Sequence, residues 1–315
     1  MIDLHHDLLS IMYYCYKKND YSFLDKWIKN FHDGNVSGLI ANLYYMSLDE
    51  MERELGSRNF DVIEMFQRSI EMFQKYLPNE KVVFSIEGCD YINDISELER
   101  LYDLGLRNIL LVWNCPNKYG SGNRGDYGLT DLGKEFLIKA IDLGISLDLS
   151  HMNKKTFYDT IDLVREQQSL GKEVKVIASH SNCYEICHHE RNLDDDQIKA
   201  LGSVGGLLGL VAYSVFTRDS DNHENLKDVY LEHITRAVSL LGIDHVCVSS
   251  DDMEFYKALF DENFGDMIFD YSSIKEEMTN LLKKRFTDLE IDKLLYQNIF
   301  NKLDFNISIG KGEKV

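Results

Sequence analysis

The chain begins with the stretch Met1-Ile2-Asp3-Leu4-His5-His6-Asp7, and the rest of the sequence is organised around it. Side chains two positions apart on a β-strand point to the same face, so His5 and Asp7 can grip one cation from a strand end. His6 would point to the opposite face. Alternatively, these residues are an ordinary polar N-terminus. Further His, Glu and Asp residues lie at the ends of other apolar runs, which favours the metal-binding interpretation.

Composition narrows the classes of protein to which the chain can belong. It has 315 residues, 44% of them hydrophobic, and a net charge of -19. This acidity argues against a nucleic-acid partner, because affinity for phosphate backbones comes mostly from Lys and Arg. No apolar run approaches the length of a membrane span, and the N-terminus lacks the basic and apolar blocks of a signal peptide. We therefore expect a cytoplasmic protein without a membrane partner.

Eight short apolar runs alternate with longer segments of helical periodicity. Many of the runs are apolar on both faces, which is typical of parallel strands covered by helices. The predicted strands are Met1–Asp7, Gly38–Met46, Val82–Gly88, Asn108–Asn114, Ser146–His151, Lys175–Ser181, Gly206–Ser214 and His245–Asp252.

The segments between these runs carry helix signals. An apolar stripe at three- and four-residue spacing is formed by Leu226, Tyr230, Ile234, Ala237 and Leu241. Capping boxes are predicted at Ser47–Glu50, Asp94–Glu97 and Ser273–Glu276. Glycines stand where helices should end, at Gly105, Gly144, Gly171, Gly202 and Gly242.

Eight strand–helix units without a linker-like stretch predict an α/β fold, a single (β/α)8 barrel of the TIM type over residues 1–315. The alternative is an open, doubly wound sheet. A nucleotide-binding sheet of that kind carries a glycine-rich phosphate loop after its first strand. Here that place is taken by His5-His6-Asp7-Leu8-Leu9, which favours the barrel.

In such a barrel the active site lies at the C-terminal ends of the strands. The polar residues at the ends of the predicted strands are His5, Asp7, Glu87, His151, His180 and Asp251. These are too many ligands for one four-coordinate zinc ion. They suit two cations about 3.5 to 4 Å apart that share a carboxylate and a hydroxide. Because two cations lower the pKa of a shared water toward neutrality, the predicted reaction class is hydrolysis.

Glu87 is our candidate for the shared carboxylate, because a buried acid at the end of an apolar strand needs positive charge nearby to stay ionised. His5 and Asp7 would hold one metal, and His151 and His180 the other. Alternatively, Glu87 caps a helix or pairs with a nearby lysine such as Lys81.

Cysteines present a second, weaker metal pattern. The six in the chain are most simply free thiols of a reducing compartment. Cys183 and Cys187 lie four residues apart between His180 and His189, so they could share a helical face with a soft metal. We favour the alternative that they are small buried residues of a helix that packs against a strand.

Six short motifs follow one another along the chain: Asp3-Leu-His-His-Asp7, Ile86-Glu-Gly88, Gly128-Leu-Thr-Asp-Leu-Gly133, Leu147-Asp-Leu-Ser-His151, Ala178-Ser-His-Ser181 and Arg191-Asn192. In order and spacing they resemble the motifs of the membrane dipeptidase (renal dipeptidase) family, a group of amidohydrolase-like metal barrels. The resemblance runs from residue 1 to about residue 252. It implies a metallo-dipeptidase with two Zn²⁺ ions, other divalent metals remaining open, which cleaves free dipeptides and often accepts a D-residue at the second position.

The resemblance also implies roles for single residues. It makes His5 and Asp7 ligands of one zinc, Glu87 the bridge, and His151 and His180 ligands of the other. Arg191 would receive the substrate carboxylate, for which a planar guanidinium is suited; alternatively it pairs with Glu190 or Asp194. Asp251 would carry the proton from the attacking water to the leaving amine, with Asp252 as a rival.

The chain departs from the family pattern at the predicted end of its fourth strand. Where the family has a histidine that stabilises the oxyanion, this chain has Trp113, followed by Asn114, and we expect both to contact the substrate. Losing such a donor costs on the order of 10² to 10³ in rate. The indole N–H of Trp113 could substitute for it, although we favour a reshaped pocket. Leu4 also replaces a common glycine, and we expect no leader or lipid anchor of the kind that secreted animal members carry.

Three hypotheses follow for the function. The first is a cytoplasmic dipeptidase. The second is a hydrolase of another small amide, lactam or modified dipeptide, to which Trp113 adapts the site. The third is a metal-binding barrel without catalysis, although the predicted ligands leave room for water, unlike a closed structural site. A homodimer is left open.

Overall fold

The computed structural model describes residues 1–44, 48–57, 60–260 and 265–305. Its eight strands form one sheet in which each strand pairs in parallel with the next along the chain. The strands are β1 (Ile2–His6), β2 (Gly38–Tyr44), β3 (Lys81–Glu87), β4 (Leu106–Leu110), β5 (Ser146–Asp148), β6 (Val176–Ala178), β7 (Leu207–Val211) and β8 (Val246–Ser249).

The sheet curls into a barrel in which β8 returns to β1. The backbone amide of Asp251 donates to the carbonyl of His5 at 3.2 Å across this seam. The side chain of Asp3 also crosses it, because its carboxylate accepts the amide of Ser250 at 2.8 Å. The predicted (β/α)8 barrel is therefore confirmed, and the open sheet is excluded.

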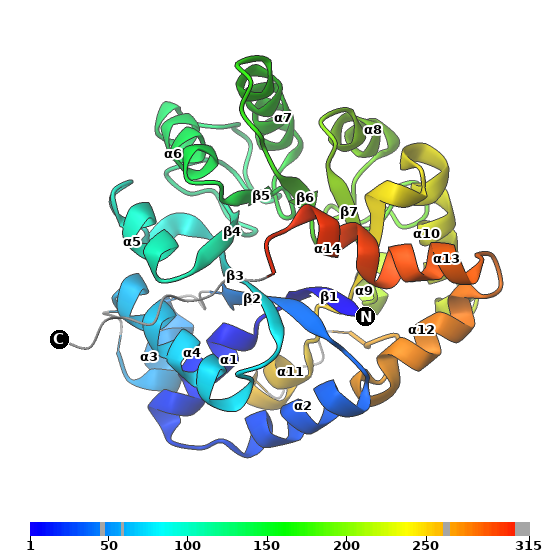
Figure 1. The fold of residues 1–315 in the computed structure, drawn as a ribbon, viewed down its shortest axis with the longest axis horizontal. Coiled ribbons are helices and arrows are strands. Elements are labelled where there is room, and N and C mark those ends of the chain that lie inside the picture. The colour runs from blue at the N-terminus through cyan, green and yellow to red at the C-terminus, as the bar shows by residue number, and fades with distance from the viewer. Residues whose placement is uncertain (45–47, 58–59, 261–264, 306–315) are drawn as a thin grey trace.

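Helices surround the strands (Figure 1). The α-helices are α1 (Leu8–Lys18), α2 (Ser22–Asp33), α3 (Leu48–Leu55), α4 (Val62–Tyr76), α5 (Glu97–Asp103), α6 (Asp131–Asp142), α7 (Lys154–Ser169), α8 (Asp195–Ser203), α9 (Ser214–Thr217), α10 (Leu226–Leu241), α11 (Glu254–Phe260), α12 (Ile274–Leu282), α13 (Asp288–Asp292) and α14 (Asn298–Lys302). Shorter turns are η1 (Cys89–Tyr91), η2 (Ile243–His245), η3 (Tyr271–Ser273) and the π-helical η4 (Lys293–Gln297). Within the described ranges, no helix combines the length and apolarity needed to cross a bilayer.

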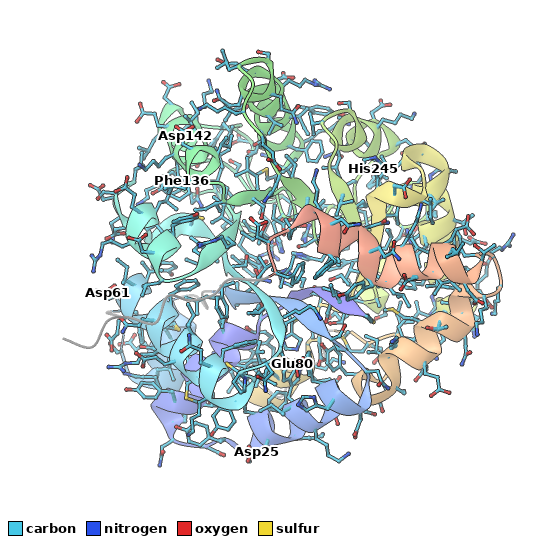
Figure 2. All side chains as sticks on the ribbon, viewed as in Figure 1. Asp25, Asp61, Glu80, Phe136, Asp142 and His245 are labelled. Carbon is cyan, nitrogen blue, oxygen red and sulfur yellow. The ribbon has the colours of Figure 1, made fainter. Side chains whose placement is uncertain are left out.

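Apolar side chains fill the space between strands and helices, whereas charged ones lie on the circumference. Phe136 of α6 is fully buried, and Figure 2 shows Asp25, Asp61 and Asp142 around the outside of the ring. A separate cluster closes one end of the barrel. Ile2, Leu4, Ile40, Val83, Ile177, Leu207 and Cys247 pack there with Ile299, Leu303 and Phe305 of the C-terminal segment. In Figure 1, α14 crosses this closed end, so only the opposite, C-terminal end of the strands can hold a site.

Several predicted boundaries are wrong, because the predicted strands, apart from the one over 38–46, extend past the last residue of the observed strand. The predicted strand over 108–114 ends as β4 at Leu110, and β5 and β6 stop at Asp148 and Ala178. Asp148 explains the last two, because its carboxylate accepts the backbone amides of Ser150 and Ser179, each at 3.0 Å. His151, His180 and Asp251, which were expected at strand ends, therefore lie on the turns that follow, whereas His5 and Glu87 lie within β1 and β3.

The helix signals gave mixed results. The stripe of 226–241 is confirmed as α10. The box at 47–50 and the end of the predicted strand at 45–46 lie outside the described residues. The other two predicted boxes are wrong: Ser273 makes no capping bond, and Asp94 accepts the amide of Ser96, one residue early. Four predicted glycines have positive φ, but Gly202 lies inside α8, and Gly205 takes that conformation instead.

Candidate metal centre

All the site residues that the sequence analysis names line one cavity of about 410 Å³ at the C-terminal end of the barrel. They are His5, Asp7, Glu87, Trp113, Asn114, His151, His180, Arg191 and Asp251. They come from β1 and β3 and from the turns after β4, β5, β6 and β8, which converge at this end because the strands are parallel.

The carboxylate of Glu87 lies at the centre of the cluster. Its Oε2 is 3.0 Å from Nε2 of His5, and its Oε1 is 3.0 Å from Nε2 of His151 and 3.8 Å from Nε2 of His180. One oxygen thus faces the imidazole of β1, and the other faces the two later imidazoles. Lys81, the suggested alternative partner, lies at the opposite end of β3, over the rings of Tyr296 and Phe300.

His5 and Asp7 point to the same side of the chain, as their spacing of two residues predicts. His5 and Asp7 lie on the cavity side, with 3.5 Å between Nε2 of His5 and Oδ1 of Asp7. Oδ1 of Asp7 is buried and receives no hydrogen bond from the residues that the structure describes. His6 points outward, where its ring packs edge-on against Trp27 at a centroid distance of 4.6 Å.

His151 and His180 reach the cluster from neighbouring turns. Their Nε2 atoms are 2.9 Å apart. His151 has a φ of +69°, a conformation that non-glycine residues seldom adopt and that is often found at functional sites. This backbone turn directs the imidazole inward although β5 has already ended.

Burial and neighbouring charges shift the pKa values of Glu87 and of the three imidazoles. Burial, reinforced by Asp7 and Asp251, raises the pKa of Glu87 to about 7 despite the opposing effect of His5. Burial disfavours a charged His5, but Glu87, Asp7 and Asp251 outweigh it and raise the pKa of His5 well above its usual value. Burial, with Arg191 and His5, lowers the pKa of His151 and His180 far below the usual value. These two imidazoles are therefore neutral, with lone pairs for a cation.

The two neighbouring aspartates face different cavities. Asp251 lines the metal-site cavity, and its Oδ1 is 3.9 Å from Nε2 of His5. Burial raises the pKa of Asp251 to about 6, and Asp7 adds to the shift against the opposing His5. Asp252 instead lines a second cavity, and its Oδ1 accepts the amide of Glu254 at 3.0 Å. Of the two aspartates, Asp251 is therefore the one that faces the proposed metal ligands.

Arg191 is buried in the wall of the cavity, with 5% of its surface exposed. Its Nη2 donates to the carbonyl of His180 at 3.3 Å, and its Nε has no hydrogen-bond partner among the described residues. The suggested partners are engaged elsewhere, because Glu190 accepts from Asn123 at 2.7 Å and Asp194 pairs with Lys154 at 2.5 Å. The guanidinium is thus available to an anion in the cavity.

Trp113 and Asn114 lie beyond the end of β4 and contact the same histidine. The Trp113 ring is 5.9 Å from the ring of His151 and 5.1 Å from that of Tyr44. Oδ1 of Asn114 accepts a hydrogen bond from Nδ1 of His151 at 2.8 Å. Asn114 therefore orients an imidazole, a contact that the sequence analysis did not foresee.

Two further residues that the sequence analysis missed also contact the imidazoles. Nδ2 of Asn42 lies 3.0 Å from Nδ1 of His5. Oγ of Ser179 lies 2.8 Å from Nδ1 of His180 and 3.4 Å from Nδ1 of His5. Their only sequence signal was the polar residue itself, Asn42 within an apolar strand and Ser179 directly before a histidine.

The predicted helix around Cys183 and Cys187 is wrong, because both residues lie in the turns between β6 and α8, where they are buried free thiols. Cys183 is fully buried, its amide donates to Nδ1 of His233 at 3.0 Å, and burial raises the pKa of its thiol to about 12. Burial also raises the pKa of the Cys187 thiol to about 12. Over the described residues, the group of His, Cys, Asp and Glu side chains with metal-binding geometry is His5, Glu87 and His180, whose ligand atoms lie within 4.8 Å of one another.

The donor set fits divalent metal binding. Three imidazoles direct Nε2 toward one carboxylate, two of those imidazoles are neutral, and Oδ1 of Asp7 is buried without a hydrogen bond from the described residues. Buried carboxylates as close together as Asp7, Glu87 and Asp251 need more positive charge than His5 and Arg191 supply. Bound cations would provide it.

The model of the family described as membrane dipeptidase (peptidase family M19) matches residues 49–304. This range includes Glu87, His151, His180, Arg191 and Asp251. His5 and Asp7 precede it, so their assignment depends on the geometry above.

Relatives include an uncharacterized protein in the pqqA 5′ region of Klebsiella pneumoniae, 28% identical over 228 residues, or 69% of this chain and 79% of the relative. An uncharacterized dipeptidase of Schizosaccharomyces pombe is 30% identical over 177 residues, 54% of this chain and 41% of the relative. Among solved structures, a metallopeptidase from Rhodobacter sphaeroides liganded with a phosphinate mimic of the dipeptide L-Ala-D-Ala has a TM-score of 0.71 at 18% identity, covering 95% of this chain and 97% of that one. A metallopeptidase of family M19 named dipeptidase AC has a TM-score of 0.69 at 19% identity, covering 95% and 96%.

Proposed function

Since the chain belongs to the membrane dipeptidase family (peptidase family M19), we propose that it is a zinc-dependent dipeptidase that hydrolyses the peptide bond of free dipeptides. The observation that carries the proposal is the carboxylate of Glu87. Its two oxygens are divided between His5 on one side and His151 and His180 on the other, which is the arrangement of a bridging ligand.

His5 and Asp7 would hold one metal ion, and His151 and His180 the other, with Glu87 shared. Two Zn²⁺ ions suit a set of imidazole and carboxylate ligands, and other divalent metals are compatible with it. When bound, the metal would lower the pKa of a water toward neutrality, so that it could act as nucleophile, and would polarise the peptide carbonyl.

Asp251 would carry the proton from the attacking water to the leaving amine. It lines the cavity beside His5, and its pKa is raised to about 6. A carboxyl group with a pKa near the working pH can both accept and return a proton. Its neighbour Asp252 faces the other cavity, which favours Asp251 for this role.

Arg191 would bind the free carboxylate of the substrate. Burial lowers the pKa of Arg191 to about 10, so the group remains charged at neutral pH, and its unpaired Nε faces no competitor. A planar guanidinium that accepts a carboxylate in two parallel hydrogen bonds fixes both position and orientation. The structural relative with the phosphinate mimic of L-Ala-D-Ala supports including dipeptides with a D-residue at the second position.

The rest of the cavity wall is largely aromatic and favours apolar substrate side chains. Its aromatic part comprises Trp113, Tyr44, Tyr213, Phe216, Tyr256 and Phe260, and the polar side chains of Asn123, Arg124, His189 and Glu190 also line the cavity. The indole of Trp113, close to His151, supports a second candidate function: hydrolysis of another small amide, a lactam or a modified dipeptide. A barrel that only binds metal is disfavoured, because a structural site would be closed by protein ligands rather than open to a cavity.

A panel of L-Xaa-L-Xaa and L-Xaa-D-Xaa dipeptides tests the proposal. The zinc-loaded protein should release free amino acids, and Asp251→Asn should not, although it retains its metal. A protein with both metal sites filled that turns over no dipeptide would exclude the dipeptidase. Turnover of lactams or other amides by that same protein would favour the second candidate.

A further inference from the structure

Each of the three imidazoles in the cluster directs one ring nitrogen toward Glu87 and the other toward a polar side chain. The Nε2 atoms face the carboxylate of Glu87. Nδ1 of His5 faces Asn42 and Ser179. Nδ1 of His151 faces Asn114, and Nδ1 of His180 faces Ser179. The three facing side chains come from β2 and from the turns after β4 and β6.

This division of the nitrogens decides which tautomer is present. A neutral imidazole carries one proton, and the nitrogen that binds a metal must be the unprotonated one. If Nε2 is the ligand atom, each Nδ1 carries hydrogen and needs a hydrogen-bond acceptor. Oδ1 of Asn114 and Oγ of Ser179 are acceptors at 2.8 Å from His151 and His180.

Asn42 meets the same requirement after a half-turn of its amide. Its Nδ2 is placed toward His5, while its Oδ1 is buried without a hydrogen bond. The two atoms of a side-chain amide exchange places by a 180° rotation, and the hydrogen-bond network decides between them. A His5 that carries hydrogen on Nδ1 turns Oδ1 of Asn42 toward it, which gives that oxygen a donor.

Ser179 has a special place, because it reaches imidazoles on both sides of Glu87. Its hydroxyl is 2.8 Å from Nδ1 of His180 and 3.4 Å from Nδ1 of His5. It is fully buried, and its amide donates to Asp148 at 3.0 Å, which holds the residue in place. One hydroxyl therefore touches a proposed ligand of each metal.

We propose that Asn42, Ser179 and Asn114 are positioning residues that hold the three histidines with hydrogen on Nδ1 and a free lone pair on Nε2, and that Ser179 links the two metal sites. This inference rests on the proposed metal ligands, but not on the substrate. Asn42 acts on the His5 site alone and Asn114 on the His151 site alone. Loss of Ser179 weakens both sites.

Zinc affinity, measured by competition with a chromogenic chelator, tests this pattern without any substrate. Removing such an outer partner costs about 10- to 100-fold in metal affinity. Ser179→Ala should show that loss for both zinc ions, and Asn114→Ala for one. The matched control is Ser181→Ala, which removes an equally buried hydroxyl that has no hydrogen-bond partner. Equal affinities in Ser179→Ala and Ser181→Ala would overturn the inference.

The tautomer has a test of its own. Asn42→Asp supplies an acceptor but no donor, so it should keep zinc affinity, whereas Asn42→Leu should lose about 10-fold. Loss in both variants would mean that His5 needs a donor, contrary to the inference. In the unaltered protein labelled with ¹⁵N-histidine, NMR should show three zinc-bound imidazoles protonated at Nδ1; protonation at Nε2 would contradict it.

These measurements separate the two proposals. Normal dipeptide turnover with equal zinc affinities in the serine variants would leave the dipeptidase standing and remove the positioning roles. The expected affinity pattern in a protein that cleaves no dipeptide would support the positioning roles and exclude the dipeptidase.

Discussion

Asp3 and Ser250 join the first and last strands of the barrel. The buried carboxylate of Asp3 accepts the backbone amide of Ser250 at 2.8 Å and also its hydroxyl, and the hydroxyl of Tyr271 donates to it at 3.1 Å. The turn that follows Ser250 carries Asp251, whose amide bonds to the carbonyl of His5. The seam that closes the barrel therefore also places two residues of the cluster.

Asp3→Ala should destabilise the fold. It leaves buried donors of Ser250 and Tyr271 without an acceptor, at a cost on the order of 3 kcal/mol in the free energy of unfolding. Chemical denaturation of the zinc-saturated protein measures this. Asp25→Ala, on the exposed face of α2, is the control and should change the free energy by less than about 0.5 kcal/mol. Equal effects of the two variants would refute the role of Asp3 in the seam.

Asp251→Asn should reduce kcat for dipeptides by about 10²- to 10⁴-fold, because an amide cannot carry the proton. Zinc content should remain that of the native enzyme. The neighbouring Asp252→Asn, in the other cavity, should keep kcat within a few-fold. Steady-state kinetics with metal analysis checks both. A greater loss in Asp252→Asn would reverse the assignment.

Arg191→Lys should raise KM for dipeptides more than it lowers kcat, because a lysine keeps the charge but loses the two-pronged contact with a carboxylate. Arg191→Met should raise KM further, since it removes the charge as well. Dipeptide amides, which lack the carboxylate, provide the control: the native enzyme and both variants should handle them about equally poorly. A variant effect of the same size on the amides would show that Arg191 acts elsewhere.

Trp113→His should increase dipeptide turnover, because an imidazole N–H at this position adds a donor for the developing oxyanion. Such a donor is worth on the order of 10² in rate. Trp113→Phe keeps an aromatic ring without the N–H, so it should leave the native rate unchanged. A large drop in Trp113→Phe would mean that the indole N–H already serves as the donor. A drop in Trp113→His would favour the alternative substrates.

His233 should make stability depend on pH. It is fully buried, with Nδ1 accepting from Cys183 and Nε2 donating to the carbonyl of Thr217 at 2.8 Å. Burial lowers its pKa from 6.5 to about 4, although the bond to Thr217 opposes the shift. Between pH 4 and 6.5 the unfolded chain therefore binds the additional proton, and the folded state loses stability as the pH falls.

The full effect amounts to about 3 kcal/mol, from 1.36 kcal/mol for each pKa unit. His233→Gln does not titrate, so the difference in unfolding free energy between native protein and variant should shrink as the pH is lowered from 7 to 4. Denaturation curves at several pH values measure it. A difference that stays constant with pH would contradict the neutral, buried state of His233.

The order of elements could be read from the sequence because period and length are local properties. Runs such as Val82–Gly88 are too apolar to be anything but buried, and the stripe of α10 repeats at the helical period. Strand ends were predicted less well. The carboxylate of Asp148 bonds to an amide of the next turn and to Ser179, 31 positions away, and such a long-range contact ends two strands at once.

The sequence by itself determined the barrel and the ligand candidates, because the ends of several strands carry polar residues and parallel strands must bring those ends together. Only the tertiary structure decided how Glu87 divides its oxygens, which of Asp251 and Asp252 faces the cavity, and that Asn42, Asn114 and Ser179 touch the imidazoles. These are relationships between side chains from different strands. They depend on backbone turns such as the positive φ of His151 and on distances of about 3 Å, which no local pattern specifies.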